Sequence, residues 1–593
     1  MKKSLLLFVL LIACSGFVWI LSAENEHPLD SVYSDVGKPA AVADPETVLR
    51  RMSLQLRGNI PKLNEVQSVV RDPRIIDRYA SEFVQDPDFA RYWGTYFASV
   101  FREQSKGKKI KYASFLTYIA NSLYQNKPYD VWVREMLTAQ GSPEENPAVD
   151  LYLRDGADPL QVAEYVGRVF YGERVACARC HDHPYLKFSR RDYYGLAAFF
   201  SQQFNASGSW NPALFGGGAV PKELVENLPD QKRKEMIQKW SEWNRETWNK
   251  MSKEEREAYK KQHELKYATL YYNADLGLRF PNSDDAPGGD LVQPRFPDGT
   301  VPKLKGGEDR RVIFAAWLTD QKNSRFRKVL INRVWTRLMG WSFFAPLDDW
   351  NDDTKIQGEK ILSHLDQVFV QKQMRIKDLV QYIISSNAYK RRPPVAGERD
   401  RDSAIAYFQP QRLDPDQLMN SLVRGSGALE IKSGDLRERS LTGPGPGSGI
   451  KNPEENQKEF TTAFDVPRPA DDRTFLAVFG SGDRMDIADD DDTITVEQVL
   501  TLLNGRTTGR LSWDYGKKGS FISNVYDQTK DMNQVYDSMF QSTLGRRARD
   551  FEKAGLARIA QEKVGKEKGE FRPELMQDIV WSIFNSQEFL HVK

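Results

Sequence analysis

Residues 158–200, DPLQVAEYVGRVFYGERVACARCHDHPYLKFSRRDYYGLAAFF, predict the local fold on which the interpretation of this chain depends. Asp158 is a favourable N-cap, Pro159 suits the first helical position, and apolar residues recur at helical spacing until Gly172. A second helix is expected after Ser189, because an acidic residue three positions later completes a capping box. The stretch therefore predicts two amphipathic helices joined by a polar loop.

The loop between these helices carries C-A-R-C-H at residues 177–181, the C-x-x-C-H sequence to which c-type haem is attached. Cys177 and Cys180 are three residues apart, so their thiols can reach the two vinyl groups on one haem edge, and His181 can then bind the iron. We expect haem c here, bound covalently by both cysteines, with His181 as the proximal iron ligand. The flat apolar macrocycle is expected to lie between the two helices.

The same loop allows two other interpretations. Cys177, Cys180 and His183 are donors of the types that bind zinc, so a zinc-binding structural or hydrolytic protein is the alternative. The cysteines could instead form a disulfide or stay free, in an envelope interaction protein without a cofactor. If haem is bound, Asp182 or His183 is expected to tune the iron ligand by hydrogen bonding. The iron could be five-coordinate, or a second ligand could come from a distant segment, where Met236, His263 and Met339 are options.

The N-terminus carries an export pattern. Residues 1–23 begin with Lys2 and Lys3 and continue as an uncharged apolar run, which is typical of a signal peptide or of an uncleaved membrane anchor. Cys14 follows Leu-Ile-Ala, which resembles a lipoprotein box, so lipidation is a third possibility. Each of these places the body outside the cytoplasm. We expect a periplasmic or cell-envelope protein whose only membrane contact is this segment.

The composition excludes several classes of protein. The chain has 593 residues, enough for about three or four domains, and 40% of them are apolar, which excludes wholesale disorder. The net charge of +2 argues against nucleic-acid binding, which needs a basic surplus. The mean hydropathy of −0.59 excludes a protein with many membrane spans. The metal-protease, nucleophile-elbow, Walker and dinucleotide motifs are absent, so no familiar hydrolase, kinase or dehydrogenase is indicated.

The fold class is expected to be mainly α, because helical patterns prevail and no strand-rich region is seen. The chain is predicted to divide, after residues 1–23, into a linker (24–45), a helical domain with C-x-x-C-H (46–205), an insertion (206–305) and a second helical domain (306–593). Within the insertion, residues 230–262 predict a charged helical hairpin whose tryptophans offer a surface for protein partners.

Several stretches resemble two known families. CARCHDHPY, DYYGLAAFF, RRMSLQLRGNIP and NKPYDVWVREML resemble the planctomycete cytochrome-C-like domain. VLINRVWTRLMGWSFFAPLDDW, IKDLVQYIISSNAYKRR and VEQVLTLLNG resemble the planctomycete-specific domain that normally follows it. The resemblance implies an exported, helical, haem-c-like protein of undefined activity, and Cys177, Cys180 and His181 match the haem-like motif of the family. Electron transfer with an unidentified redox partner is the function expected from the haem.

Two smaller features receive structural interpretations. Arg333 follows an asparagine in the second resembling region, and we expect a buried ion pair between it and Asp348 or Asp349. The four carboxylates at 489–492 lack the glycine and the closing glutamate of a calcium loop, so a solvated acidic loop is expected.

Overall fold

The computed structural model describes most of the chain, namely residues 27–34, 39–103, 113–184, 187–208, 222–262, 265–281, 289–395, 405–428, 431–432, 459–466, 474–481, 494–564 and 571–593. The predicted export segment (1–23), His263 and the acidic run 489–492 lie outside these residues. Within the described ranges, no helix is long and apolar enough to cross a membrane.

The fold is mainly α, as predicted. The first group of helices is α2 (Pro28–Ser34), α3 (Pro45–Arg57), α4 (Leu63–Arg71), α5 (Ile76–Gln85), α6 (Pro87–Val100), α7 (Ala113–Tyr124), α8 (Tyr129–Leu137), α9 (Asp150–Leu153), α10 (Pro159–Val166) and α11 (Arg190–Ala197). The second group is α14 (Arg310–Leu318), α15 (Ser324–Met339), α16 (Glu359–Gln371), α17 (Ile376–Ser385) and α18 (Asn387–Lys390). The third group is α19 (Pro415–Gly425), α20 (Phe475–Val478), α21 (Val496–Asn504), α22 (Arg506–Gly516), α23 (Phe521–Thr529), α24 (Met532–Leu544), α25 (Asp550–Val564) and α26 (Pro573–Phe584).

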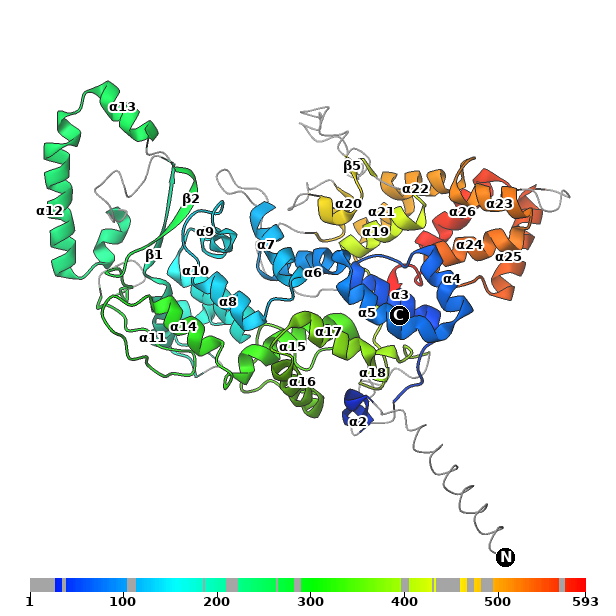
Figure 1. The fold of residues 1–593 in the computed structure, drawn as a ribbon, viewed down its shortest axis with the longest axis horizontal. Coiled ribbons are helices and arrows are strands. Elements are labelled where there is room, and N and C mark those ends of the chain that lie inside the picture. The colour runs from blue at the N-terminus through cyan, green and yellow to red at the C-terminus, as the bar shows by residue number, and fades with distance from the viewer. Residues whose placement is uncertain are drawn as a thin grey trace, which may run out of the picture.

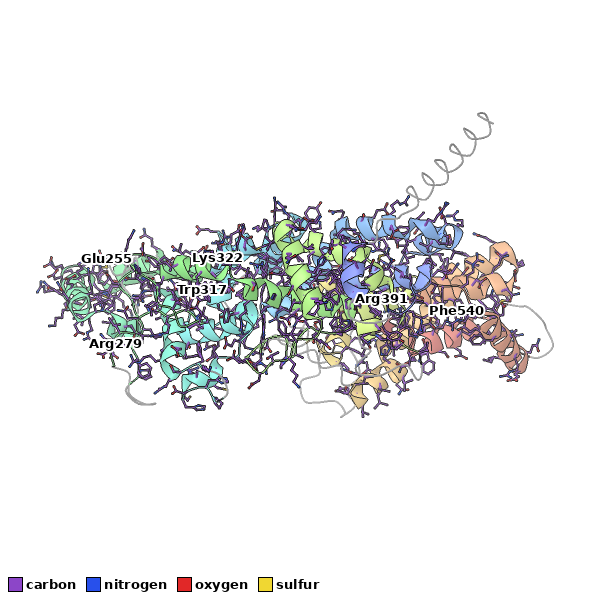
Figure 2. All side chains as sticks on the ribbon, turned by 90° about the horizontal axis from the view of Figure 1, so that it is seen from below. Glu255, Arg279, Trp317, Lys322, Arg391 and Phe540 are labelled. Carbon is purple, nitrogen blue, oxygen red and sulfur yellow. The ribbon has the colours of Figure 1, made fainter. Side chains whose placement is uncertain are left out.

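The molecule is elongated, with the third group of helices at one end (Figure 1). Figure 2 shows Glu255 of the insertion near one end of the long axis and Phe540 of α24 near the other. The first and second groups share one large hydrophobic core, which runs from Leu29 to Tyr389. The third group has its own core, to which Leu54 of α3 also contributes. The second group therefore shares its core with helices far from it in sequence.

Helix α3 lies between the two cores, and every residue from Val48 to Arg57 is buried. Its Leu49 belongs to the large core and its Leu54 to the other. Because a fully buried helix presents every face to protein, its polar side chains must find partners in the surrounding elements. Arg51 does so with three main-chain carbonyl oxygens, those of Lys593 (2.8 Å from Nε), Arg391 (2.9 Å from Nη2) and Tyr389.

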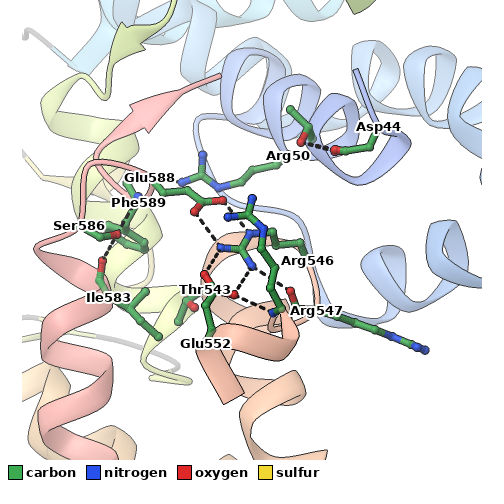
Figure 3. A network of polar contacts seen from close by, with 12 residues as sticks. Asp44, Arg50, Thr543, Arg546, Arg547, Glu552, Ile583, Ser586, Glu588 and Phe589 are labelled. Atoms are coloured by element: carbon green, nitrogen blue, oxygen red, sulfur yellow. Dashed lines mark hydrogen bonds and ion pairs between the residues drawn. The ribbon is translucent and has the colours of Figure 1, made fainter. Parts of the chain in front are cut away.

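A second arginine of α3 joins it to the C-terminal segment. Arg50 donates to the carbonyl oxygen of Phe589 over 2.9 Å, close to the short pairing of strands β3 (Gln411–Arg412) and β6 (His591–Val592). Beside it, Arg546 is held between the carboxylates of Glu552 and Glu588, each at 2.8 Å (Figure 3). These contacts attach the C-terminal strand to both α3 and the third group of helices.

Part of the predicted linker, residues 24–45, is structured instead. Leu29 and Tyr33 of α2 are buried in the large core. The Asp30 carboxylate accepts the backbone N–H of Ala388 over 2.7 Å and so caps the start of α18. The linker prediction was wrong for α2, because a helix of seven residues is too short to show a helical period, and its partners lie far away in sequence.

The insertion contains the two predicted helices, α12 (Asp230–Glu246) and α13 (Lys253–Gln262), but α13 turns away from α12 and the two do not pack side by side (Figure 1). We keep the name hairpin for residues 230–262. No residue of either helix is buried. Near its tip, the rings of Trp243 and Trp248 stack with their centroids 5.7 Å apart. The base of the hairpin is an antiparallel pair of strands, β1 (Gln203–Gly208) and β2 (Leu265–Tyr272), which the sequence did not predict. Their pairing joins segments about sixty residues apart, and no local pattern reports such a pairing.

His27 occupies the N-cap position of α2. The backbone N–H of Leu29 donates to its Nδ1 over 3.3 Å, and its ring packs on Tyr382 with the centroids 4.6 Å apart. The Tyr382 hydroxyl in turn lies 2.7 Å from Nε2 of His364. Burial is the main cause that lowers the pKa of His27 below 6.5, His364 and Lys390 lower it further, and Asp30 opposes them. Burial also lowers the pKa of His364.

We expect α2 to loosen in mild acid. Because the folded-state pKa of His27 lies below its unfolded value of 6.5, the folded state holds the neutral ring, and this stability falls as the pH drops from 6.5 through the folded pKa. Protonation of Nδ1 would also remove the cap of Leu29 and place a cation at a helix N-terminus. Hydrogen exchange of residues 28–34, corrected for intrinsic rates, should show less protection at about pH 5 than at about pH 7.

His27→Asn is the matched variant, because asparagine can cap the helix but does not titrate. It should remove most of the pH dependence of this protection while leaving the protection near neutral pH similar. An equal loss of protection in the wild type and in this variant would contradict the role assigned to His27.

Candidate functional site

The helix before the C-x-x-C-H loop forms as predicted. The side chain of Asp158 accepts the backbone N–H of Leu160 over 2.9 Å, and Pro159 is the first residue of α10. The helix then widens into the π-helix η3 (Gly167–Tyr171) and ends at Gly172, whose φ of 69° is left-handed. Glycine is required there, because a Cβ would lie 2.6 Å from a methyl carbon of Val329.

The helix after the loop, α11, begins with the predicted capping box. The Ser189 hydroxyl accepts the N–H of Asp192 over 3.2 Å, and the Asp192 carboxylate accepts the N–H of Ser189 over 2.9 Å. The Asp182 carboxylate also caps this helix, since it accepts the N–H of Arg190 over 2.7 Å. The loop is therefore tied to the first turn of α11 at two points.

The two helices pack directly on each other. The Tyr193 hydroxyl of α11 donates to the carboxylate of Glu164 on α10 over 2.7 Å. Apolar residues of both helices, Val162 and Leu196 among them, are buried in the large core. The prediction that a macrocycle lies between these helices is therefore wrong. The apolar side chains that suggested a binding space contact the other helix and the large core instead.

Both cysteines lie on the outer side of the loop. The 3₁₀ turn η4 (Ala176–Arg179) and the residue after it carry them, and both are free thiols exposed to solvent. Ala178, between them, is fully buried and donates its N–H to the carbonyl of Val175 over 3.0 Å. The buried alanine fixes the turn on the core, so Cys177 and Cys180 are both directed away from it.

His181 is exposed beside these thiols, and its ring has a defined hydrogen bond. Its Nδ1 lies 2.7 Å from the backbone carbonyl oxygen of Asp182. Because a carbonyl oxygen only accepts, the neutral ring carries its proton on Nδ1, and the lone pair of Nε2 faces outward. This is the tautomer in which a histidine binds a metal through Nε2. The backbone carbonyl of Asp182 thus orients the His181 ring, while the Asp182 carboxylate caps α11.

His183 is half-buried, and its backbone N–H donates to the backbone carbonyl of Phe188 over 2.9 Å. Throughout the part of the chain that the structure describes, no three His, Cys, Asp or Glu side chains gather closely enough to hold a metal ion. The set predicted for zinc, Cys177, Cys180 and His183, is therefore not assembled in this arrangement. Two of the side chains considered as a second iron ligand are part of protein cores. Met339 is buried in the large core, and Met236 packs against a small apolar cluster in the insertion that includes Val225 and Leu228.

Comparison with known proteins identifies two family models. PSCyt2, a protein of unknown function (DUF1549), matches residues 29–204, and PSD1, a protein of unknown function (DUF1553), matches residues 310–560. The chain carries the planctomycete-type pair of these two domains. The resemblance seen in the sequence is thereby confirmed. No curated protein and no solved structure matches the chain.

The PSCyt2 domain, with its C-x-x-C-H loop, is attached to the PSD1 domain by a buried carboxylate. Asp348 of PSD1, whose side chain is 3% exposed, accepts hydrogen bonds from Arg168 (2.8 Å) and Arg174 (2.7 Å) of PSCyt2. Burial raises the pKa of Asp348, but the bonds from Arg174 and Arg168 outweigh it, so the net shift is downward. The two arginines flank Gly172, whose carbonyl accepts the N–H of Trp350 over 2.6 Å.

The predicted ion pair of Arg333 with Asp348 or Asp349 was wrong. Arg333 donates instead to the main-chain carbonyl of Arg168 over 3.1 Å. The partners of Asp348 lie more than 170 residues away in sequence, and no local signal marks them. Sequence reasoning therefore found the buried aspartate but not the arginines that neutralise it.

Asp348→Asn should destabilise the protein by about 2–3 kcal/mol, because it leaves two partly buried guanidinium groups without a charged acceptor. Chemical denaturation followed by tryptophan fluorescence would measure the loss. Asp353→Asn, a change at an exposed aspartate of the same loop, should leave the midpoint nearly unchanged. Equal effects of the two variants would contradict the role given to Asp348.

Proposed function

We propose that this protein is an exported c-type cytochrome-like protein of the cell envelope, with haem attached through Cys177 and Cys180 and with His181 as an iron ligand. Electron transfer is the function that such a group would serve. The observation that carries the proposal is the combination of two exposed free thiols on one turn with an adjacent histidine whose Nε2 lone pair faces outward. C-x-x-C-H with this arrangement offers each of the three atoms that haem attachment uses.

The two thiols and the histidine are the donor set of haem c, and a haem attached to them would lie elsewhere than predicted. Since α10 and α11 pack on each other, a haem attached to these thiols would have its place on the exposed side of the turn. When bound, haem would supply a one-electron redox centre. An exposed haem would be open to water, which raises the polarity around it, and within reach of a partner.

The residues of the chain each have a role toward this group. The buried Ala178 holds the turn on the core, so that both thiols keep their direction. The Asp182 carbonyl orients the His181 ring and keeps its proton on Nδ1. The Asp182 carboxylate, bound to the N–H of Arg190, holds that carbonyl in place. The site is thus supported by hydrogen bonds that run from the loop into α11.

The proposal is tested by expressing the full chain with a c-type haem maturation system. A denaturing gel stained for haem should show a band at the mass of the chain, because thioether bonds survive denaturation. Cys177→Ser with Cys180→Ser should abolish the stain. His181→Ala should keep the stain but change the visible spectrum of the folded protein, because an iron ligand is lost.

His591→Ala is the matched control, since that histidine, in strand β6, also bonds through Nδ1 to a main-chain carbonyl, that of Gln587, at 2.9 Å. It should change neither the stain nor the spectrum. A colourless protein with stoichiometric zinc would overturn the proposal in favour of the zinc alternative. A protein with neither cofactor would favour an interaction protein, with the hairpin of α12 and α13 as its surface.

A further inference from the structure

Four buried polar atoms near the end of α2 have no hydrogen-bond partner. They are the Tyr33 hydroxyl of α2, the indole Nε1 of Trp335 on α15, the indole Nε1 of Trp341 just after that helix, and Nη1 of Arg391 directly after α18. Each of these residues is at most 6% exposed. Because nearly every buried polar group in a folded protein is hydrogen-bonded, four unpartnered atoms in one place require an explanation. We call these four residues the donor cluster.

The side chains of the donor cluster pack together. The ring centroid of Tyr33 lies 6.3 Å from that of Trp335 and 4.1 Å from the guanidinium carbon of Arg391. The rings of Trp335 and Trp341 meet edge to face with their centroids 5.2 Å apart. Burial raises the pKa of Tyr33, while Arg391 and the Trp341 N–H oppose that rise, so both groups lie close to the tyrosine hydroxyl. The donor cluster is therefore one site, built from three segments far apart in sequence.

The chemistry of the four atoms selects a ligand that accepts hydrogen bonds. Indole and guanidinium N–H groups only donate, and the Tyr33 hydroxyl can donate as well. The three N–H groups cannot bond to one another, because none of them has an acceptor. A water molecule accepts only two hydrogen bonds and would leave at least one of the three N–H groups unbonded. A small anion can accept from all four atoms.

The charge of Arg391 also favours an anion. An arginine side chain keeps its positive charge inside a protein, and among the described residues this one forms no ion pair with an aspartate or glutamate side chain. Burial lowers its pKa, and Tyr33 and Asp30 oppose that shift. The oxygens of Asp30 accept the backbone N–H groups of Asn387 (2.9 Å) and Ala388 (2.7 Å). Asp30 therefore attracts Arg391 from beyond ion-pair distance and leaves its Nη1 without an acceptor.

We infer that the donor cluster binds a small monovalent anion of halide size, which accepts hydrogen bonds from the Tyr33 hydroxyl, the two indole N–H groups and Arg391. Such an ion would join α2 to α15 and to the segment after α18. The inference is independent of the proposed function, because the donor cluster shares no residue with the C-x-x-C-H loop or with the helices that flank it.

The test titrates the full chain with sodium bromide, which replaces sodium gluconate at constant ionic strength, and follows tryptophan fluorescence. A bromide ion bound against two indole rings quenches them, so we expect a saturable loss of emission with a midpoint on the order of 10 mM. Its amplitude should not exceed the share of two of the thirteen tryptophans. Added chloride should compete and move the midpoint to higher bromide.

Tyr33→Phe should raise the bromide midpoint about tenfold, because it removes one donor to the ion. Folding should be preserved, since the lost hydroxyl has no partner in the protein. Tyr165→Phe is the matched control, because the Tyr165 hydroxyl on α10 is also buried and unpartnered but lies outside the donor cluster. It should leave the midpoint unchanged. Arg391→Met should abolish the saturable quenching, and Tyr33→Phe decides the question if that variant does not fold.

Three results would overturn the inference. Quenching of the wild type that rises linearly with bromide, without a saturable part, would show that the donor cluster holds no anion. The same midpoint in Tyr33→Phe as in the wild type would show that the ion binds elsewhere. Equal shifts in Tyr33→Phe and Tyr165→Phe would show a general effect on the large core, to which both tyrosines belong.

Discussion

The burial of charged side chains on helix α3 is the constraint on which the architecture depends. A guanidinium group inside a protein is tolerated only when its N–H groups are bonded. Burial lowers the pKa of Arg50 and of Arg51 to about 10, and among the described residues neither forms an ion pair with an aspartate or glutamate side chain. Main-chain carbonyls replace the missing anions, and those carbonyls come from α18 and from the C-terminal segment. The helix can therefore be buried only where these distant segments meet.

This requirement explains why the cores do not follow the order of the chain. Helices α14 to α18 belong to the PSD1 match, but they share the large core with the PSCyt2 helices. The remaining PSD1 helices form a core of their own. Asp348, with its two arginines, secures the shared core on the side of the C-x-x-C-H loop. The C-x-x-C-H loop therefore packs on the large core, to which both domains contribute side chains.

The buried Ala178 packs the turn against this core, while both thiols stay exposed. Predicting the helices beside the turn from sequence succeeded, because caps, apolar spacing and Gly172 are local signals that act within one element. Predicting a space between the helices failed, because an apolar stripe reports only that a surface is buried, and not what covers it. Here the apolar stripe of each helix is covered by the other helix and by the large core. The tautomer of His181 could not be predicted from the sequence either, because it depends on the position of the Asp182 carbonyl oxygen.

The sequence by itself determined the mainly α class, the boundaries of the helices around Cys177 and Cys180, the two helices of the insertion and the membership of both domain families. Each of these depends on residues close together in the chain. Only the tertiary structure decided the partners of Asp348, the burial of α2, the pairing of β1 with β2 and the exposure of the thiols. These depend on segments far apart in sequence, whose contacts are set by the packing of whole helices and leave no periodic trace in either segment.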